Sequence, residues 1–253
     1  MPGLSALLLA ALREMCPQLV MNDAETYVSS CEFAYFTHKI MAACDMLDGY
    51  NDGIVINPED CEFEPERLVV DKIACEGQKT IMTALMATVI RKIREGLRGP
   101  LGAKIRYGLT PVTNHGTLAN ITTGPDGTRA AYHIALPVLD NLLLPPGVNP
   151  TSFTPADYFA LWAQAPVEWG WTLLTESTGF TGLRDSCTKL LSWHSSIDDT
   201  IPHEGTVEFS KRLQRHMSGA YKVDEFYPLF LAPGAGHCAL GKDRCLRSLS
   251  LRW

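Results

Sequence analysis

Three aspartates lie close together in the segment CDMLDGYNDGI, which runs from Cys44 to Ile54. Asp45, Asp48 and Asp52 would disfavour one another's ionised forms if they came together with nothing between them, because like charges repel. A positive group among them removes this repulsion, and the two glycines of the segment permit the tight turns that such an arrangement needs. The segment therefore predicts a site for a cation.

A carboxylate and a histidine follow two apolar runs near the end of the chain. Asp198 follows the run LLSW in WHSSIDDTIP, and His237 follows the run YPLFLAP in PGAGHC. In an open α/β sheet, functional groups gather just beyond the carboxyl ends of the strands. This chain order matches the last two members of an α/β-hydrolase triad, in which the aspartate orients the imidazole and the imidazole acts as general base. The alternative is that both side chains lie on loop surfaces without a catalytic role.

The elements around this pair are predicted from the same apolar runs. Each run is interpreted as a strand, and residues 204–216 between them as a helix. A strand, a helix and a strand in succession predict a parallel sheet with crossover helices, whose buried strands form continuous apolar runs. The sequence therefore predicts an α/β fold with the pair at one edge of its sheet.

Helices are predicted in three earlier segments. Residues 27–46 have apolar residues at helical spacing up to the aspartates, and residues 78–97 have one apolar face that Gly96 closes. This face consists of Ile81, Leu85, Val89, Ile93 and Leu97. A third helix is predicted from Thr154, the N-cap, to Gln164, with Pro155 at its first position. Its apolar side consists of Phe159, Leu161 and Trp162.

Two other segments have weaker patterns. Leu4, Leu7, Leu8 and Leu12 predict the buried stripe of an amphipathic helix, and no Lys or Arg precedes them as in a signal peptide. Residues 108–150 are rich in Thr, Asn, Gly and Pro, which predicts an irregular insertion with short strands at most. No apolar run reaches the roughly 18 residues that a membrane span needs, so we expect no membrane partner.

Composition narrows the class of protein and its compartment. A net charge of -6 gives no basic field, so we expect no nucleic-acid partner. Eight cysteines without a C-x-x-C or a zinc spacing favour an oxidising compartment and a secreted protein. The glycosylation sequon at residues 120–122 agrees with this location.

The motifs together resemble the tannase and feruloyl esterase family. CTKLLSWHSSIDDTIPHEGTVEF and FYPLFLAPGAGHC are similar to the end of that family, where W-H-x-x-x-D-x-x-I-P and P-G-x-G-H-C recur. The first segment is similar to C-D-x-x-D-G-x-x-D-G-[VI], the calcium motif of the family's lid. The resemblance covers nearly the whole chain. It implies a partial α/β-hydrolase fold with a large calcium-binding lid insertion. In this interpretation residues 1–20 are a remnant of the hydrolase domain, residues 21–185 form the lid, and residues 186–253 form the C-terminal part of the hydrolase domain.

The resemblance also implies calcium as the cofactor. Its ligands would be the carboxylates of Asp45, Asp48 and Asp52 and the backbone carbonyls of Tyr50 and Ile54, a set of oxygens such as calcium prefers. An EF-hand loop starting at Asp48 and ending at Glu59 is a second interpretation, and a solvated acidic turn is a third.

One cysteine pairing follows from the same family pattern. The resemblance implies a disulfide between Cys44 and Cys61, which would close the acidic loop. Cys75 matches the later half of another family pair, but Val70 stands where its partner is expected, so its pairing stays open.

The function implied is that of a secreted serine carboxylic ester hydrolase that cleaves esters of phenolic acids such as gallate or ferulate. Asp198 would orient the base and His237 would be the base. The nucleophile is expected in G-C-S-x-G-G upstream of the lid, and no G-x-S-x-G occurs in this sequence. Ser177, in TESTGF, lacks the preceding glycine and is not expected to serve. We therefore expect a fragment that is inactive by itself, or alternatively a non-catalytic binding module stabilised by calcium.

Overall fold

The computed structural model describes most of the chain. The described residues are 15–75, 77–99, 102, 107–116, 118–126, 129–131, 139–141, 143–145, 147–148, 153–173 and 177–237. The helix expected around Leu4 to Leu12 lies outside the described residues, as do Cys238 and Cys245.

Two helices begin the described part of the chain, α2 (Cys16–Asp23) and α3 (Ser30–Cys44). Ser29 caps α3 in a capping box with Glu32, in which each side chain bonds the backbone N–H of the other residue. Phe33, Phe36 and Ile40 are buried along one face of α3. The helix ends at the acidic loop, as the sequence predicted, with a short 3-10 turn, η1 (Asp45–Asp48), and Gly49 in the left-handed region at φ 90°.

The predicted helix over residues 78–97 is wrong at its beginning. Residues Gln78–Ile81 form strand β2, which pairs antiparallel with β1 (Lys72–Cys75), and helix α4 spans Ala84–Glu95 with Thr83 as its N-cap. Ile81 and Leu85 are 51% and 59% exposed, so the apolar face predicted for this helix begins only after them. The helical period extends by chance into the hairpin, and the cap at Thr83 decides where the helix starts.

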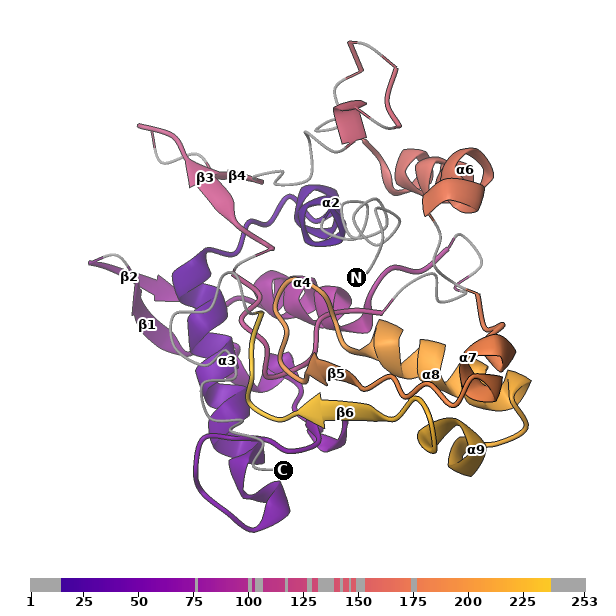
Figure 1. Cartoon of the computed structure of the whole chain (residues 1–253). Coiled ribbons are helices and arrows are strands. Elements are labelled where there is room, and N and C mark those ends of the chain that lie inside the picture. Colours follow the sequence, from indigo (N-terminus) through magenta and orange to yellow (C-terminus); the bar gives the residue numbers. More distant parts are fainter. Residues whose placement is uncertain are drawn as a thin grey trace.

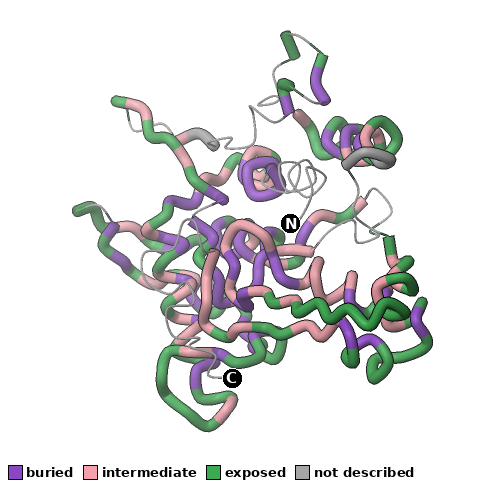
Figure 2. The backbone as a smooth tube through the Cα atoms, viewed as in Figure 1, coloured by how far each residue is buried: buried purple, intermediate pink, exposed green. Residues whose placement is uncertain are grey.

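The largest core lies between α3 and α4. Buried side chains concentrate there in Figure 2, and they also come from β1 and from the loop that contains the short 3-10 turns η2 (Pro58–Asp60) and η3 (Pro65–Leu68). Two disulfides cross this region: Cys31–Cys75 joins α3 to β1, and Cys44–Cys61 joins the end of α3 to the loop. The loop is therefore held to α3 by the Cys44–Cys61 disulfide and by apolar side chains that it contributes to the core.

The insertion contains a short antiparallel pair, β3 (Ile121–Thr123) and β4 (Arg129–Ala131), in agreement with the short strands expected. Helix α6 (Pro155–Leu173) begins where the sequence predicted but continues past Pro166. Tyr158 and Leu161, before the proline, are buried in a second core, and the partly buried Trp169, after it, packs against the same core, which stabilises the helix on both sides of Pro166. Phe159 is 38% exposed and does not belong to the buried side. None of the described helices is long and apolar enough to cross a membrane.

The last part of the described chain is the α/β part. Strands β5 (Ser192–Ser195) and β6 (Leu229–Ala232) are parallel, and helix α8 (Glu204–His216) connects them with α9 (Ala220–Asp224), while α7 (Thr181–Asp185) precedes β5. The predicted strand, helix and strand are thus confirmed. In Figure 1 these elements lie beside the group formed by α2, α3 and α4.

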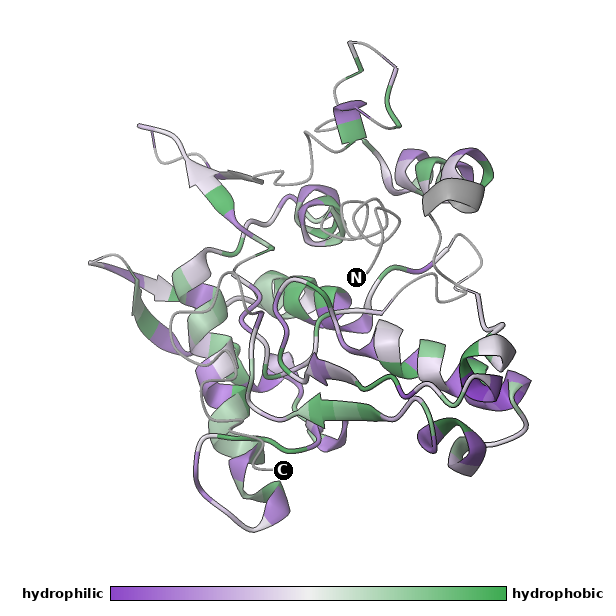
Figure 3. Ribbon diagram, in the orientation of Figure 1, coloured by the Kyte–Doolittle hydropathy of each residue, from purple (hydrophilic) through white to green (hydrophobic). Residues whose placement is uncertain are grey.

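The two parallel strands are not buried as the sequence predicted. β6 is hydrophobic in Figure 3, yet it and the segment around β5 leave large apolar side chains exposed. The exposed side chains are Leu190, Leu191, Trp193, Phe230 and Leu231, at 40–54%. Continuous apolar runs predict burial only where layers cover both faces of a sheet, and the described residues do not supply both layers.

Candidate functional site

Asp198 and His237 meet beyond the carboxyl ends of the two parallel strands. The Nδ1 atom of His237 lies 3.0 Å from each carboxylate oxygen of Asp198. Two backbone hydrogen bonds continue the pairing past the strands, from the N–H of Ser196 to Ala232 and from that of Ile197 to Ala235. These bonds hold the two loops side by side and thereby bring the acid and the imidazole together.

The environment of Asp198 keeps its carboxyl group ionised. Burial by itself would raise the pKa of Asp198, but hydrogen bonds from two histidines and from the backbone N–H groups of Ile201 and Thr200 lower it to about 2. Asp198 is therefore an anion at neutral pH. An anion facing Nδ1 places the proton of a neutral His237 on that atom and leaves Nε2 unprotonated, which is the state of a general base.

His194 is a third member of this site that the sequence interpretation did not assign. Its Nε2 atom lies 2.8 Å from the carbonyl oxygen of Ile201 and 3.4 Å from Asp198 Oδ2, while its Nδ1 atom lies 2.7 Å from the hydroxyl of Thr206. Because Nε2 faces only acceptors here, it carries the proton, and Nδ1 accepts from Thr206. His194 thus donates toward Oδ2 of the carboxylate that His237 also contacts, and its spacing of four residues before Asp198 is the signal that could have found it.

Comparison with known proteins identifies the family of this chain. A family model described as tannase and feruloyl esterase matches residues 10–248. The chain belongs to the tannase and feruloyl esterase family. A probable feruloyl esterase from Arthroderma benhamiae is 33% identical over 227 residues, which are 89% of this chain and 42% of the relative. Feruloyl esterase B from Aspergillus niger is 27% identical, again over 227 residues, with 87% and 41% covered.

Solved structures of the tannase and feruloyl esterase family share the fold. Tannin acyl hydrolase from Aspergillus niger superimposes with a TM-score of 0.85 at 20% identity and covers 91% of this chain, which is matched to 45% of that structure. Feruloyl esterase B from Aspergillus oryzae has a TM-score of 0.71 at 21% identity, with 92% and 45% covered. The α/β-hydrolase-like fold is confirmed, and the chain spans less than half the length of the relatives that it matches.

The acidic loop bonds its own backbone. Oδ1 of Asp45 accepts from the N–H groups of Gly53 and Ile54, at 2.9 and 3.1 Å. Oδ1 of Asp48 accepts from Tyr50, and Oδ1 of Asp52 from Ile54. Within the described residues, the three carboxylates do not form a group whose ligand atoms all lie within 4.8 Å of one another. The loop offers oxygen donors only, which fits calcium chemically, but its carboxylates would have to converge on the ion.

The structure also places the cysteines and Ser177, which were singled out from the sequence. Cys44 and Cys61 form a disulfide, as the resemblance implied, and Cys75 pairs with Cys31, which the sequence left open. Ser177 is exposed, and its Oγ accepts from the N–H of Gly179. It precedes α7, which leads into the amino end of β5, whereas Asp198 and His237 follow the carboxyl ends of the strands (Figure 1).

Proposed function

We propose that this chain carries the acid and the base of a serine carboxylic ester hydrolase that acts on esters of phenolic acids, such as ferulate or gallate. The observation that supports the proposal is the contact of Asp198 with His237 beyond parallel strands in a tannase and feruloyl esterase fold. The phenolic substrate is suggested by the names of the relatives, feruloyl esterase and tannin acyl hydrolase.

Each residue of the pair has a separate role in this reaction. Asp198 holds the Nδ1–H of His237 and stabilises the imidazolium that forms when Nε2 takes the proton of the serine hydroxyl. The imidazolium then gives that proton to the departing alcohol. Only the serine makes the covalent bond, and no G-x-S-x-G motif presents one in these 253 residues. We therefore propose that the 253 residues by themselves do not turn over esters.

A burst-kinetics assay with chromogenic ferulate and gallate esters tests whether the 253 residues by themselves turn over esters. The chain should release product no faster than its His237→Ala variant. Turnover that disappears in a Ser177→Ala variant would instead identify Ser177 as the nucleophile. Turnover that survives in that variant would point to another serine in the chain.

A chimera tests the roles of the acid and the base. In the chimera, residues of this chain replace the matching 42% of the Arthroderma benhamiae relative, and the remainder of that relative is unchanged. We expect ferulate ester hydrolysis that falls by about 10⁴-fold in Asp198→Asn and His237→Ala variants, as for other triads. A folded chimera whose activity is unchanged by both substitutions would contradict the proposal.

We also propose that the acidic loop binds calcium through Asp45, Asp48, Asp52 and the carbonyls of Tyr50 and Ile54. The disulfide that closes this loop supports a fixed, structural site, and it agrees with the secreted location that we propose. Bound calcium would supply charge compensation for the three carboxylates. Calorimetric titration with calcium chloride should give heat of binding that an Asp48→Ala, Asp52→Ala variant lacks. Ferulate binding with calcium but without any activity in the chimera would favour the alternative of a binding module.

A further inference from the structure

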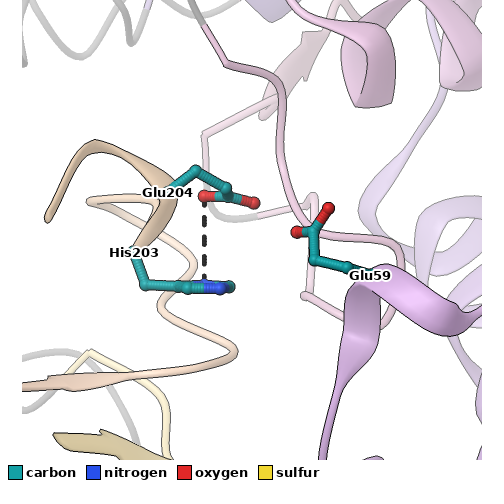
Figure 4. Close-up of side chains that lie close together, drawn as sticks. All are labelled: Glu59, His203 and Glu204. Carbon is teal, nitrogen blue, oxygen red and sulfur yellow. Dashed lines mark ion pairs between the residues drawn. The ribbon is translucent and has the colours of Figure 1, made fainter. Parts of the chain in front are cut away.

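Three side chains outside the Asp198–His237 pair face one another across a small gap. Glu59 lies in η2, His203 precedes α8, and Glu204 is the first residue of that helix. One ligand atom from each residue lies within 4.8 Å of the other two. Figure 4 shows that the carboxylate of Glu59 comes from a different segment and approaches the other two side chains.

His203 is buried and Glu204 is partly buried, and each has a polar atom without a hydrogen-bond partner. His203 is 3% exposed, and its Nδ1 atom makes no hydrogen bond. Oε2 of Glu204 also makes no hydrogen bond, and it lies 3.9 Å from Nδ1 of His203. Oε1 of Glu204 accepts from the hydroxyl of the buried Thr110 at 2.8 Å, so the carboxylate is held in place by its other oxygen.

The hydrogen bonding of His203 leaves its Nδ1 atom as an acceptor, as Oε2 of Glu204 also is. Burial lowers the pKa of His203, and the ring makes a hydrogen bond to the backbone of Ser196. Since Nδ1 has no partner, this bond is made by Nε2–H, and the lone pair of a neutral ring is on Nδ1. A lone pair and a carboxylate oxygen that face each other need a donor or a cation between them.

A cavity gives access to the same place. Its volume is about 270 Å³, and Glu59, Glu204 and Thr110 line it. Two arginines of α4 also line the cavity, but both are bound elsewhere: Arg91 to Glu66 and Glu95, and Arg94 to the carbonyl of Phe63.

We propose that Glu59, His203 and Glu204 bind one divalent transition-metal ion of the zinc class, through Nδ1 of the imidazole and one oxygen of each carboxylate. An imidazole with two carboxylates is a donor set that suits zinc better than calcium or magnesium, which prefer oxygen alone. Tetrahedral zinc at 2.0–2.2 Å from its ligands separates them by about 3.4 Å, so the observed 3.9 Å needs little adjustment. Three protein ligands leave the fourth position to water.

The ion would join two segments that are distant in the sequence. Glu59 lies two residues before Cys61, which is bonded to Cys44 at the end of α3. His203 lies at the end of the loop that carries Asp198. A bound ion would therefore fix the loop of Asp198 against the segment closed by the disulfide. Glu59 lies in the same disulfide-closed loop as the proposed calcium ligands but is none of those five residues, and the site does not depend on the proposed ester hydrolysis.

Calorimetric titration of the EDTA-treated chain with zinc chloride tests the site. We expect one ion per chain. We expect binding to weaken at least about 10-fold in Glu59→Gln and in Glu204→Gln, since even outer partners of metal ligands change affinity by 10- to 100-fold. Glu62→Gln, which removes an exposed carboxylate from the same loop, is the matched control and should bind as the unchanged chain does.

Several results would overturn the proposal. They are the absence of saturable zinc binding, binding unchanged in Glu59→Gln, and equal affinity for magnesium. If Glu204→Gln does not fold by circular dichroism, Glu59→Gln still decides, because Glu59 is exposed. A rise in the melting temperature with zinc that Glu59→Gln loses and Glu62→Gln keeps would support the link between the segments. Zinc binding that is retained in the Asp48→Ala, Asp52→Ala variant separates this site from the calcium loop.

Discussion

Nδ1 of His237 lies 3.0 Å from both carboxylate oxygens of Asp198, although the two residues are 39 positions apart in the sequence. Parallel pairing of β5 with β6 produces this contact, because it places the two following loops at the same edge. The contact is made by the loops that follow these two strands. The carboxylate and the imidazole are therefore paired in a chain that spans less than half the length of its relatives.

The pKa of Asp198, lowered to about 2, makes stability depend on acid pH. The ionised carboxylate stabilises the folded state fully above its unfolded pKa of about 4, and this contribution is lost as the pH falls toward 2. Its size is about 2 kcal/mol. The difference in the free energy of unfolding between the unchanged chain and Asp198→Asn should shrink over this range in urea titrations. Asp185→Asn, at an exposed position, controls for the loss of one charge.

His115 should make stability depend on pH in a different window. It is 2% exposed, stacks on Phe33 and bonds the carbonyl of Thr113, and burial lowers its pKa to about 4. Above pH 6.5 the ring is neutral in both states. As the pH falls toward 4, only the unfolded chain takes up the proton, so about 3 kcal/mol of stability is lost. His115→Asn should remove this loss, and His38→Asn, which is exposed, should retain it.

Val70 has a backbone conformation that favours glycine. Its φ is 73°, and its side chain is 74% exposed, so a change there removes strain and little packing. Val70→Gly should raise the free energy of unfolding by about 0.5–1 kcal/mol, because relief of the left-handed strain exceeds the entropy cost of glycine. Ile56→Gly, at a comparably exposed position without a positive φ, should lower it instead. A decrease for Val70→Gly in thermal or urea unfolding would contradict the assignment of strain.

The ion pair between Glu32 and Arg129 joins α3 to β4. Glu32 has a side chain only 1% exposed, and its Oε2 lies 3.0 Å from Arg129 Nη1. Arg129→Met should lower the free energy of unfolding by about 2–3 kcal/mol, because a buried carboxylate loses its charged partner. The loss is smaller than for a fully buried pair, because water reaches the arginine's side of the ion pair. The double variant with Glu32→Gln should recover most of the loss. Arg215→Met, in an exposed pair with Glu208, is the control and should change stability by less than about 0.5 kcal/mol.

Some of the fold could be predicted because its signals are local. The bounds of α8 match the prediction, and α3 begins near Ser29, whose cap with Glu32 lies within one turn. Loop residues after parallel strands meet by a general rule, so Asp198 and His237 could be paired without a structure. Fold class and family likewise came from contiguous motifs.

Tertiary structure decided what depends on contacts between distant segments. The sequence contained Ile81 in a helical period, but pairing with β1 made it part of an exposed hairpin. Cys31 and Cys75 are bonded across 44 positions, and Glu59 reaches His203 from another part of the chain. Spacing reports only on neighbours within a turn or a strand. Which distant side chains share a buried space is fixed by how the elements pack, and packing depends on the whole chain at once.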